Sequence, residues 1–375
     1  MEDVFLSALE LVRREQPGAL ATVVSGKGSL PMSKRAKMLV RRDGSIAGTV
    51  GGGCLEAEVW TAARRVMEEG RPVFRTFTLT AETAEAEGLT CGGSVEILIE
   101  PLNSCWPEEI LEEIAAARRA GRFALLATRL DENAPAADGA KMLWREDGVT
   151  RGSLGNPEAE AAVREAVEKL KPIPDDFIRV LELERPAGLR IFLESVCPDP
   201  TFYLFGGGHI SLPLAKIAKM AGFRVVVIDD RQAFANQERF PMADETLVME
   251  MEGAVSRLKI DRRSYIVAVT RGHQHDKTVI RQAARTDAAY VGMIGSRRKI
   301  KLMWKELEAE GIPRARLEAV HAPIGLEIGA DTPEEIAVSI MAEIIGVRRE
   351  KAESRIKTKG DGKESDGINR INRMK

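Results

Sequence analysis

Part of this chain occurs twice. Residues 36–66 align with residues 140–170 without a gap, and thirteen of the 31 aligned positions are identical. After this stretch the second copy is shorter by about ten residues, and the part it lacks includes the counterpart of Thr90–Gly93. Identity at a constant offset of 104 residues predicts one structural module in two copies, which constrains the fold more than any single motif does.

The two copies share one pattern of predicted elements. In each copy two short strands flank an Asp-Gly turn, at Asp43-Gly44 and at Asp147-Gly148, and a stretch with helical spacing follows. Asp-Gly between apolar runs is a strong hairpin signal, because both residues tolerate a positive φ. We therefore predict a duplicated α+β module, with a first repeat over residues 1–104 and a second, degenerate repeat over residues 105–198.

The copies differ where the predicted helix begins. The first copy reads Gly51-Gly52-Gly53-Cys54, whereas the second reads Gly155-Asn156-Pro157-Glu158. A helix N-terminus favours the thiolate form of a cysteine, and the thiolate is both the nucleophile and the metal ligand. The segment that the second copy lacks contains a further thiol in Cys91-Gly92-Gly93, where the glycines let backbone approach a ligand closely.

Two buried small residues in tight turns are the structural alternative for these cysteines. Their joint absence from the second repeat favours a function. The candidate reactive residues are the thiols Cys54 and Cys91, and the candidate binding residues beside them are Gly52, Gly53 and Gly92. Cys105 and Cys197 each follow the closing strand of a repeat, so we interpret them as structural.

The bulk composition excludes several classes of protein. The formal net charge of −2 gives no electrostatic basis for binding nucleic acid or an anionic membrane. No apolar run approaches the roughly 20 residues that a membrane-spanning helix needs, and the N-terminus lacks the basic start of a secretory signal. No two cysteines have C-x-x-C spacing, which argues against a zinc ribbon. We therefore expect a cytoplasmic protein with reduced thiols.

The pattern changes after residue 198. Short apolar strands alternate with helical stretches over residues 199–349, which predicts a parallel, doubly wound sheet and a Rossmann-like domain. Residues 350–375 are charged and carry no aromatic side chain, so we predict a disordered tail. The predicted fold class is α/β, with an N-terminal duplicated α+β module followed by the Rossmann-like domain.

A glycine-rich loop opens this second half. Gly206-Gly207-Gly208-His209 stands between a strand and a helix, where N–H groups and the helix dipole attract an anion. Asp229 lies 23 residues after Gly206, where a ribose hydroxyl is usually held, and Asp230-Arg231 follows it. Because Ser211 takes the third glycine position, a Rossmann-type domain without a bound dinucleotide is the alternative.

Two further loops carry candidate ligands. Gly295-Ser296-Arg297 begins a helix with three cations, and because the helix dipole disfavours cations there, an anionic ligand or partner is expected. His209, His273 and His275 follow strand ends, so they form either a metal or acid/base cluster or a set of loop histidines that cap helices. The sequence shows no carboxylate or cysteine spacing that supports a metal, so the metal stays unknown.

Seven strings of residues occur in order along the chain: Thr49–Glu56, Thr90–Gly93, Phe205–His209, Ile228–Arg231, Gly292–Lys299, Ala322–Leu326 and Thr332–Ile340. Taken together, they resemble the xanthine dehydrogenase accessory factor (XdhC/CoxI) family over nearly the whole chain except the last residues. The resemblance implies a cytosolic chaperone that binds molybdenum cofactor, assists or protects its sulfuration and inserts it into a molybdenum hydroxylase. A cysteine desulfurase and a second copy of the chain, in a homodimer, are further candidate partners.

One loop departs from the family pattern. The family usually has Gly-Ser-Thr-Pro-Arg-x-x-Gly-Ala ahead of the first hairpin, whereas residues 28–36 read Gly-Ser-Leu-Pro-Met-Ser-Lys-Arg-Ala. If this loop grips a phosphate or an enzyme partner, Met32 does not replace the missing arginine, and Lys34 or Arg35 would take its place. A diverged subgroup with another client hydroxylase fits this change.

Two other functions compete with the chaperone hypothesis. An NAD(P)-dependent oxidoreductase of a small molecule explains the glycine loop and Asp229 but leaves the cysteine loops without a role. A structural adaptor uses the glycines only to shape turns. The nucleotide NAD(P), or a similar one, is therefore a second candidate ligand beside molybdenum cofactor.

Overall fold

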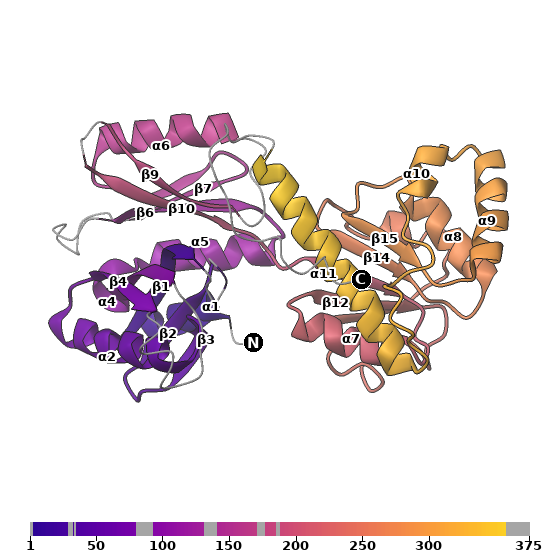
Figure 1. Ribbon diagram of the computed structural model, residues 1–375, viewed down its shortest axis with the longest axis horizontal. Coiled ribbons are helices and arrows are strands. Elements are labelled where there is room, and N and C mark those ends of the chain that lie inside the picture. The colour runs from indigo at the N-terminus through magenta and orange to yellow at the C-terminus, as the bar shows by residue number, and fades with distance from the viewer. Residues whose placement is uncertain are drawn as a thin grey trace. The chain divides into compact units, whose positions relative to one another are not determined.

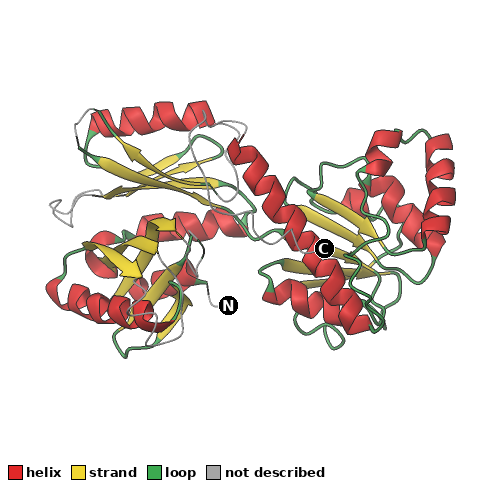
Figure 2. Ribbon diagram, viewed as in Figure 1, coloured by secondary structure: helices red, strands yellow, loops and turns green. Residues whose placement is uncertain are grey.

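Figures 1 and 2 show a computed structural model of the chain, which describes residues 3–28, 33, 35–79, 93–130, 141–170, 177–184 and 188–357. The chain divides into two compact units, of which the second spans Asp199–Ser354 and the first contains the residues up to Pro198 together with those from Arg355 on. The first unit contains both repeats, and the second contains a parallel sheet.

The first repeat is an antiparallel sheet with the strand order β3-β2-β1-β5-β4. One face of this sheet packs against the buried side of α2, through Leu55, Val59 and Val66 of that helix. Its elements are α1 (Val4–Arg13), β1 (Gly18–Gly28), β2 (Lys37–Arg41), β3 (Ile46–Thr49), α2 (Gly53–Glu69), β4 (Val73–Leu79) and β5 (Gly93–Pro101).

The second repeat has the same architecture, with the strand order β8-β7-β6-β10-β9. A hairpin followed by a helix occurs in both copies, so the predicted duplication is confirmed. Its elements are α5 (Glu108–Arg119), β6 (Ala124–Leu130), β7 (Lys141–Arg145), β8 (Thr150–Ser153), α6 (Pro157–Leu170), β9 (Ile178–Glu182) and β10 (Arg190–Val196), and the short helix α4 (Leu102–Cys105) joins the first repeat to it.

One glycine in each hairpin explains an identity between the copies. Gly48 has a φ of 79°, and a Cβ there would lie 2.3 Å from the carbonyl oxygen of Lys37. Gly152 has a φ of 72°, and its Cβ would lie 2.3 Å from the carbonyl oxygen of Lys141. Because any side chain would separate the paired strands, both copies require glycine here.

The two repeats share one hydrophobic core. Side chains alternate across a strand, so Met38 and Val40 face α2, while Leu39 between them faces the other way. Leu143 of β7 does the same in the second repeat, and it packs in one cluster with Leu39. The sheet faces that point away from α2 and α6 therefore bury each other's apolar side chains.

The second unit has five parallel strands in the order β13-β12-β11-β14-β15. This arrangement confirms the predicted parallel, Rossmann-like sheet. Its elements are β11 (Thr201–Phe205), α7 (Ser211–Met220), β12 (Arg224–Asp229), β13 (Glu245–Val248), η1 (Val255–Arg257), β14 (Ser264–Ala268), α8 (His273–Ala283), β15 (Tyr290–Met293), α9 (Arg297–Ala309), α10 (Arg314–Glu318) and α11 (Pro333–Lys357).

Helices cover both faces of the parallel sheet. Val279 of α8 and Trp304 of α9 pack against one face, and Leu214 of α7 and Ile340 of α11 pack against the other. Both faces of the strands are therefore apolar, which explains their continuous hydrophobic sequences.

The end of α11 corrects one expectation. The sequence placed the start of a disordered tail at residue 350, but α11 continues to Lys357. The rest of the predicted tail, residues 358–375, lies outside the described residues. Among the described helices, none combines the length and the apolar composition needed to cross a bilayer.

Candidate functional site

The turn that leads from β3 into α2 is built by a threonine and a glutamate. The Oγ1 atom of Thr49 donates to Glu56 and accepts a hydrogen bond from the N–H of Gly51 at 3.1 Å. Glu56 Oε1 also accepts from the N–H of Val50 at 3.2 Å. These bonds fix the chain immediately before Gly52, Gly53 and Cys54.

The second repeat forms the same turn. Ser153 donates to Glu160 at 2.6 Å and accepts from the N–H of Gly155 at 2.9 Å. Glu160 Oε1 accepts from the N–H of Leu154 at 2.9 Å. Each of these bonds has its counterpart at the matching position of the first repeat. The two helices therefore follow two separate turns that are built in the same way.

The helix caps, in contrast, differ between the repeats. In the second repeat Asn156 accepts from the N–H of Ala159 at 2.9 Å, and Pro157 is the first residue of α6. Asparagine at the cap and proline at the first helical position are a stable combination. Asn156 thus satisfies the N–H of Ala159, and Pro157 has no N–H that needs an acceptor.

The start of α2 is open by comparison. Gly52 caps it with a φ of 80° and has no side chain that could accept a hydrogen bond from the helix. A Cβ at Gly52 would meet no heavy atom within 4 Å, and the Cys54 side chain is exposed. The first repeat therefore starts its helix on glycines and an exposed thiol, where the second has an Asn-Pro cap.

The other cysteines differ from Cys54. Cys105 and Cys197 are buried, as the sequence predicted for structural residues. Burial raises the pKa of the Cys105 thiol to about 11, so this thiol is protonated at neutral pH. Cys91 and Gly92 lie outside the described residues, and their place beside Cys54 stays a prediction.

Near the end of the loop at residues 28–36, which departs from the family pattern, Arg35 makes a partly buried contact with the second repeat. Arg35 donates from Nη2 to the carbonyl oxygen of Ser195, on β10 of the second repeat, at 3.0 Å. Arg35 therefore helps to hold the two repeats together. Met32 and Lys34 lie outside the described residues.

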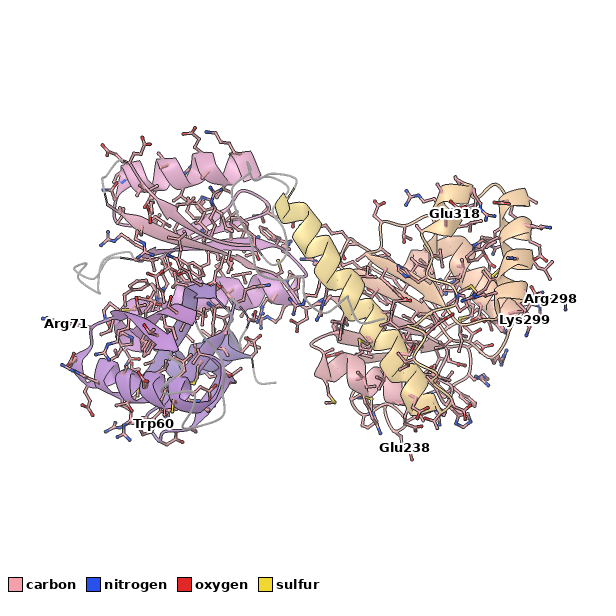
Figure 3. All side chains as sticks on the ribbon, in the orientation of Figure 1. Trp60, Arg71, Glu238, Arg298, Lys299 and Glu318 are labelled. Carbon is pink, nitrogen blue, oxygen red and sulfur yellow. The ribbon has the colours of Figure 1, made fainter. Side chains whose placement is uncertain are left out.

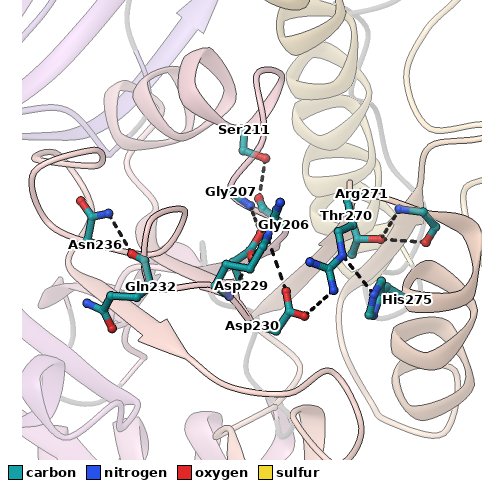
Figure 4. Close-up of polar contacts among 12 residues, drawn as sticks. Gly206, Gly207, Ser211, Asp229, Asp230, Gln232, Asn236, Thr270, Arg271 and His275 are labelled. Carbon is teal, nitrogen blue, oxygen red and sulfur yellow. Dashed lines mark hydrogen bonds and ion pairs between the residues drawn. The ribbon is translucent and has the colours of Figure 1, made fainter.

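In the second unit the candidate loops lie along one edge of the sheet. Because all five strands are parallel, the segments after β11, β12, β14 and β15 emerge at the same edge. These segments contain Gly206–His209, Asp229–Arg231, Thr270–His275 and Gly295–Arg297. Figure 4 shows the polar contacts that connect the first three of them.

Gly206 and Gly207 are packed against neighbouring backbone. A Cβ at Gly206 would lie 2.4 Å from the carbonyl oxygen of Val269, and a Cβ at Gly207 would lie 2.0 Å from that of Phe234. Gly207 N–H donates to Asp229 at 2.9 Å, and its carbonyl oxygen accepts from Arg239 at 3.0 Å. The first two glycines therefore shape the loop.

Gly208 is the open glycine of this loop. A Cβ there would meet no atom within 4 Å. In the part of the chain that the structure describes, the N–H groups of Gly208 and His209 have no hydrogen-bond acceptor. These two groups at the start of α7 are available to an anion.

Asp229 is committed to the protein's own donors. It is only 2% exposed, and it accepts hydrogen bonds from the N–H of Gly207 and from the backbone and guanidinium of Arg231, at 2.9–3.0 Å. Burial alone would raise the pKa of Asp229, but the hydrogen bonds from Arg231 and Gly207 outweigh it and lower the pKa to about 2. Its expected role toward a ribose hydroxyl stays a prediction.

A further ion pair joins two loops of this edge. Asp230 pairs with Arg271 at 2.7 Å, and Arg271 Nε lies 3.3 Å from His275 Nε2 (Figure 4). Arg231 stacks on the ring of Phe234 at 3.6 Å. The sequence had not singled out Arg239 or Arg271, although Arg271 lies in the loop after β14, where ligand-binding residues gather in such sheets.

Asp276 is a buried carboxyl that the sequence analysis also missed. It accepts from the N–H of Thr270 at 3.0 Å and from its hydroxyl at 2.7 Å. Burial raises the pKa of Asp276 to about 6, and the bonds from Thr270 lower it less. Its position in the first turn of α8, one residue after His275, was the signal that could have found it.

The metal hypothesis for the histidines gains no support. His273 and His275 lie in the first turn of α8, and His209 precedes α7. Within the described ranges, no three His, Cys, Asp or Glu side chains gather as a metal site.

The last candidate loop starts α9. Ser296 caps this helix and accepts from the N–H of Lys299 at 3.4 Å. Arg297 is exposed and pairs with Glu327. Arg298 and Lys299 are also exposed, and Figure 3 labels both at the surface of the second unit. Arg297 thus already has one carboxylate partner within the protein, and its role toward an anion stays a prediction.

Comparisons with known proteins agree with this architecture. The model of the XdhC Rossmann domain matches residues 202–344. The model of the XdhC and CoxI family matches residues 11–78 and 117–171, so it covers parts of both repeats.

Similar proteins span most of the chain. A Bacillus subtilis protein named as a probable subunit of xanthine dehydrogenase is 27% identical over 91% of this chain and 96% of its own length. The molybdenum cofactor insertion chaperone PaoD of Escherichia coli is 21% identical over 92% of this chain and 88% of its own. YqeB of Escherichia coli, an uncharacterized protein, is 26% identical, and the match spans 92% of this chain but only 46% of the length of YqeB.

A solved structure has the same fold. The crystal structure of a xanthine dehydrogenase from Bacillus halodurans matches with a TM-score of 0.75 and 25% identity, over 92% of this chain and 96% of that one. The two family models together match more than two thirds of the chain, in both of its units. The chain belongs to the XdhC/CoxI family.

Proposed function

We propose that the protein is an accessory factor that binds molybdenum cofactor and delivers it to a molybdenum hydroxylase. The observation that carries this proposal is the contrast between two copies of one module. The first copy starts α2 on an open glycine turn with the exposed thiol of Cys54, whereas the second starts α6 on a closed Asn-Pro cap. A relative that is named as a molybdenum cofactor insertion chaperone supports the same role.

The chemistry of a thiol suits this cargo. Sulfur ligands bind soft metals, and a thiolate at a helix N-terminus is stabilised by the helix dipole. We assign Cys54 and Cys91 to the molybdenum or to its terminal sulfur, with Gly52, Gly53 and Gly92 allowing close approach of the cargo. Through these thiols the protein would assist or protect sulfuration, and a cysteine desulfurase is the proposed sulfur donor.

The parallel-sheet unit is proposed to hold the anionic part of the cargo. Molybdenum cofactor carries a phosphate, and the N–H groups of Gly208 and His209 are available to an anion. The loop is held in shape by the close packing of Gly206 and Gly207 and by the hydrogen bonds that connect Gly207, Asp229 and Arg231. Asp230 and the start of α9, with Gly295, Ser296 and Arg297, are proposed as the polar rim of the same site.

An NAD(P)-dependent oxidoreductase is the alternative function. It has less support, because Asp229 already accepts four hydrogen bonds from Gly207 and Arg231. A ribose hydroxyl would have to displace Arg231 from that carboxylate. A cytoplasmic location and a homodimer complete the proposal, and both are inferred from the family resemblance.

Ligand analysis after anaerobic purification tests the proposal. The protein is expected to carry a fluorescent pterin together with molybdenum, because a thiol is a suitable ligand for this soft metal. Cys54→Ser is expected to lower the molybdenum content, while Cys105→Ser, which changes a buried thiol, serves as the matched control. A bound dinucleotide, or wild-type protein that binds no pterin when it is supplied, would contradict the chaperone function.

A further inference from the structure

Two buried ion pairs join the repeats, and each repeat supplies one lysine and one glutamate. Lys37 of β2 lies 2.9 Å from Glu194 of β10, and Lys141 of β7 lies 2.8 Å from Glu100 of β5. All four side chains are at most 8% exposed. Each ammonium also donates to a threonine of its own sheet, Thr22 at 3.4 Å or Thr128 at 3.3 Å.

The two pairs are related by the internal duplication. Lys37 and Lys141 are the same position in the two copies, since they are 104 residues apart. Glu100 stands opposite Leu20 on β1, and Glu194 stands opposite Leu126 on the matching strand β6. The repeats therefore contact each other as the two halves of a symmetric dimer do, where residue i meets residue j and j meets i.

One of these pairs leads to the Cys54 turn. Lys37 is the register partner of Thr49, whose hydroxyl holds Gly51 and Glu56 at the start of α2. The carbonyl oxygen of Lys37 also packs against Gly48, which lies on β3 next to Thr49. Glu194 is thus linked to the thiol through Lys37 and the turn, although it belongs to the repeat without the cysteine loops.

The other pair leads to the closed cap. Lys141 is the register partner of Ser153, whose hydroxyl holds Gly155 and Glu160 at the start of α6. That turn carries Asn156 and Pro157, and no thiol. The molecule therefore contains its own control, a pair with equal burial and geometry that supports the turn without a cysteine.

We propose that Glu194 is a positioning residue for Cys54, so that the degenerate repeat keeps the thiol of the first repeat in its reactive geometry. The proposal rests on the role proposed above for Cys54. Neutralising Glu194 removes the counter-charge of the buried Lys37 ammonium and weakens the contact that holds it, and the strand that carries Lys37 readjusts to that loss. Such a readjustment moves Thr49 and, with it, the turn that places Cys54 at the helix N-terminus.

The test compares Glu194→Gln with Glu100→Gln in the full-length protein. The rate at which iodoacetamide alkylates Cys54 is followed by mass spectrometry of the peptide that contains it. Glu194→Gln is expected to lower this rate about tenfold, the size of effect seen when an outer partner of a reactive group is lost. Glu100→Gln is expected to leave it within about twofold, while both variants lower the melting temperature alike.

Conservative variants keep the test valid if a glutamine variant does not fold. Glu194→Asp retains the carboxylate and is expected to restore most of the Cys54 rate, with Glu100→Asp as its control. Equal rates in the Glu194 and Glu100 variants would show that Glu194 acts only on stability, which overturns the proposal. Slower alkylation of Cys54 in Glu194→Gln without any loss of client activation supports the positioning role and refutes the role proposed for Cys54 instead.

Discussion

The first and second repeats build the turn before the helix in the same way, yet they cap the helix differently. Thr49 and Glu56 hold one turn, and Ser153 and Glu160 hold the other. The second repeat adds an asparagine cap, whereas the first leaves glycine there at a positive φ. Asparagine at a helix cap stabilises the helix over glycine by roughly a few tenths of a kcal/mol, and glycine also adds entropy to the unfolded chain.

The difference between the caps shows that the first repeat lacks a stabilising helix cap that the second repeat has. The second repeat shows that the module folds well with a closed cap and no thiol. The first repeat keeps an open start, although local stability favours the closed one. Positions that depart from the locally favoured choice are those where a function is expected.

The largest expected effect on stability tests whether the two buried lysine–glutamate pairs are equivalent. Lys37→Met and Lys141→Met each leave a buried glutamate without its counter-charge, so each is expected to lower the free energy of unfolding by about 3–5 kcal/mol. Chemical denaturation of both variants measures this. A loss in one variant that is several times the other would show that the two pairs are equivalent in geometry but not in energy. Replacing Glu100 by Leu in the Lys141→Met variant is expected to recover much of the loss.

The glycine loop of the second unit offers the same contrast between closed and open positions. Gly207→Ala places a Cβ against the carbonyl oxygen of Phe234, and it is expected to cost about 1–3 kcal/mol, as overpacking does. Gly208→Val meets open space and is expected to leave the melting temperature unchanged while the protein loses its anionic ligand. Equal ligand content in wild type and Gly208→Val would show that this loop serves the fold alone.

The smallest effect concerns the closed cap. Asn156→Ala removes the acceptor for the N–H of Ala159, and it is expected to lower stability by about 1 kcal/mol without any effect on client activation. The control is Glu158→Ala, since Glu158 occupies the position that matches Cys54. A loss of activation in Asn156→Ala would assign a function to the second repeat's helix start and end the contrast between the copies.

Much of the fold could be predicted from the sequence because it rests on local patterns. The Asp-Gly turns, the alternating strands and the glycine loop each have a physical reason that is visible in a few neighbouring residues. The end of α11 was misplaced, because residues 350–357 have a charged composition that fits a solvated helix as well as a tail.

The candidate site was less predictable. The pairing of Lys37 with Glu194 joins residues that are 157 positions apart, and a single lysine within a strand gives no sign of its partner. Arg239 was missed for the same reason, since it bonds to Gly207 on another loop of the same sheet edge. Asp229 was singled out by its spacing, but spacing does not reveal that Gly207 and Arg231 occupy its oxygens.

Client activation by cysteine variants tests the central claim most directly. A molybdenum hydroxylase is co-expressed with the wild-type protein or with Cys54→Ser, Cys91→Ser, Cys105→Ser or Cys197→Ser, and activity is measured per bound cofactor. The melting curve of each variant confirms that it is folded. The account predicts that Cys54→Ser and Cys91→Ser each lower activation strongly, while the variants of the buried Cys105 and Cys197 remain near wild type. Full activation by all four variants would contradict it.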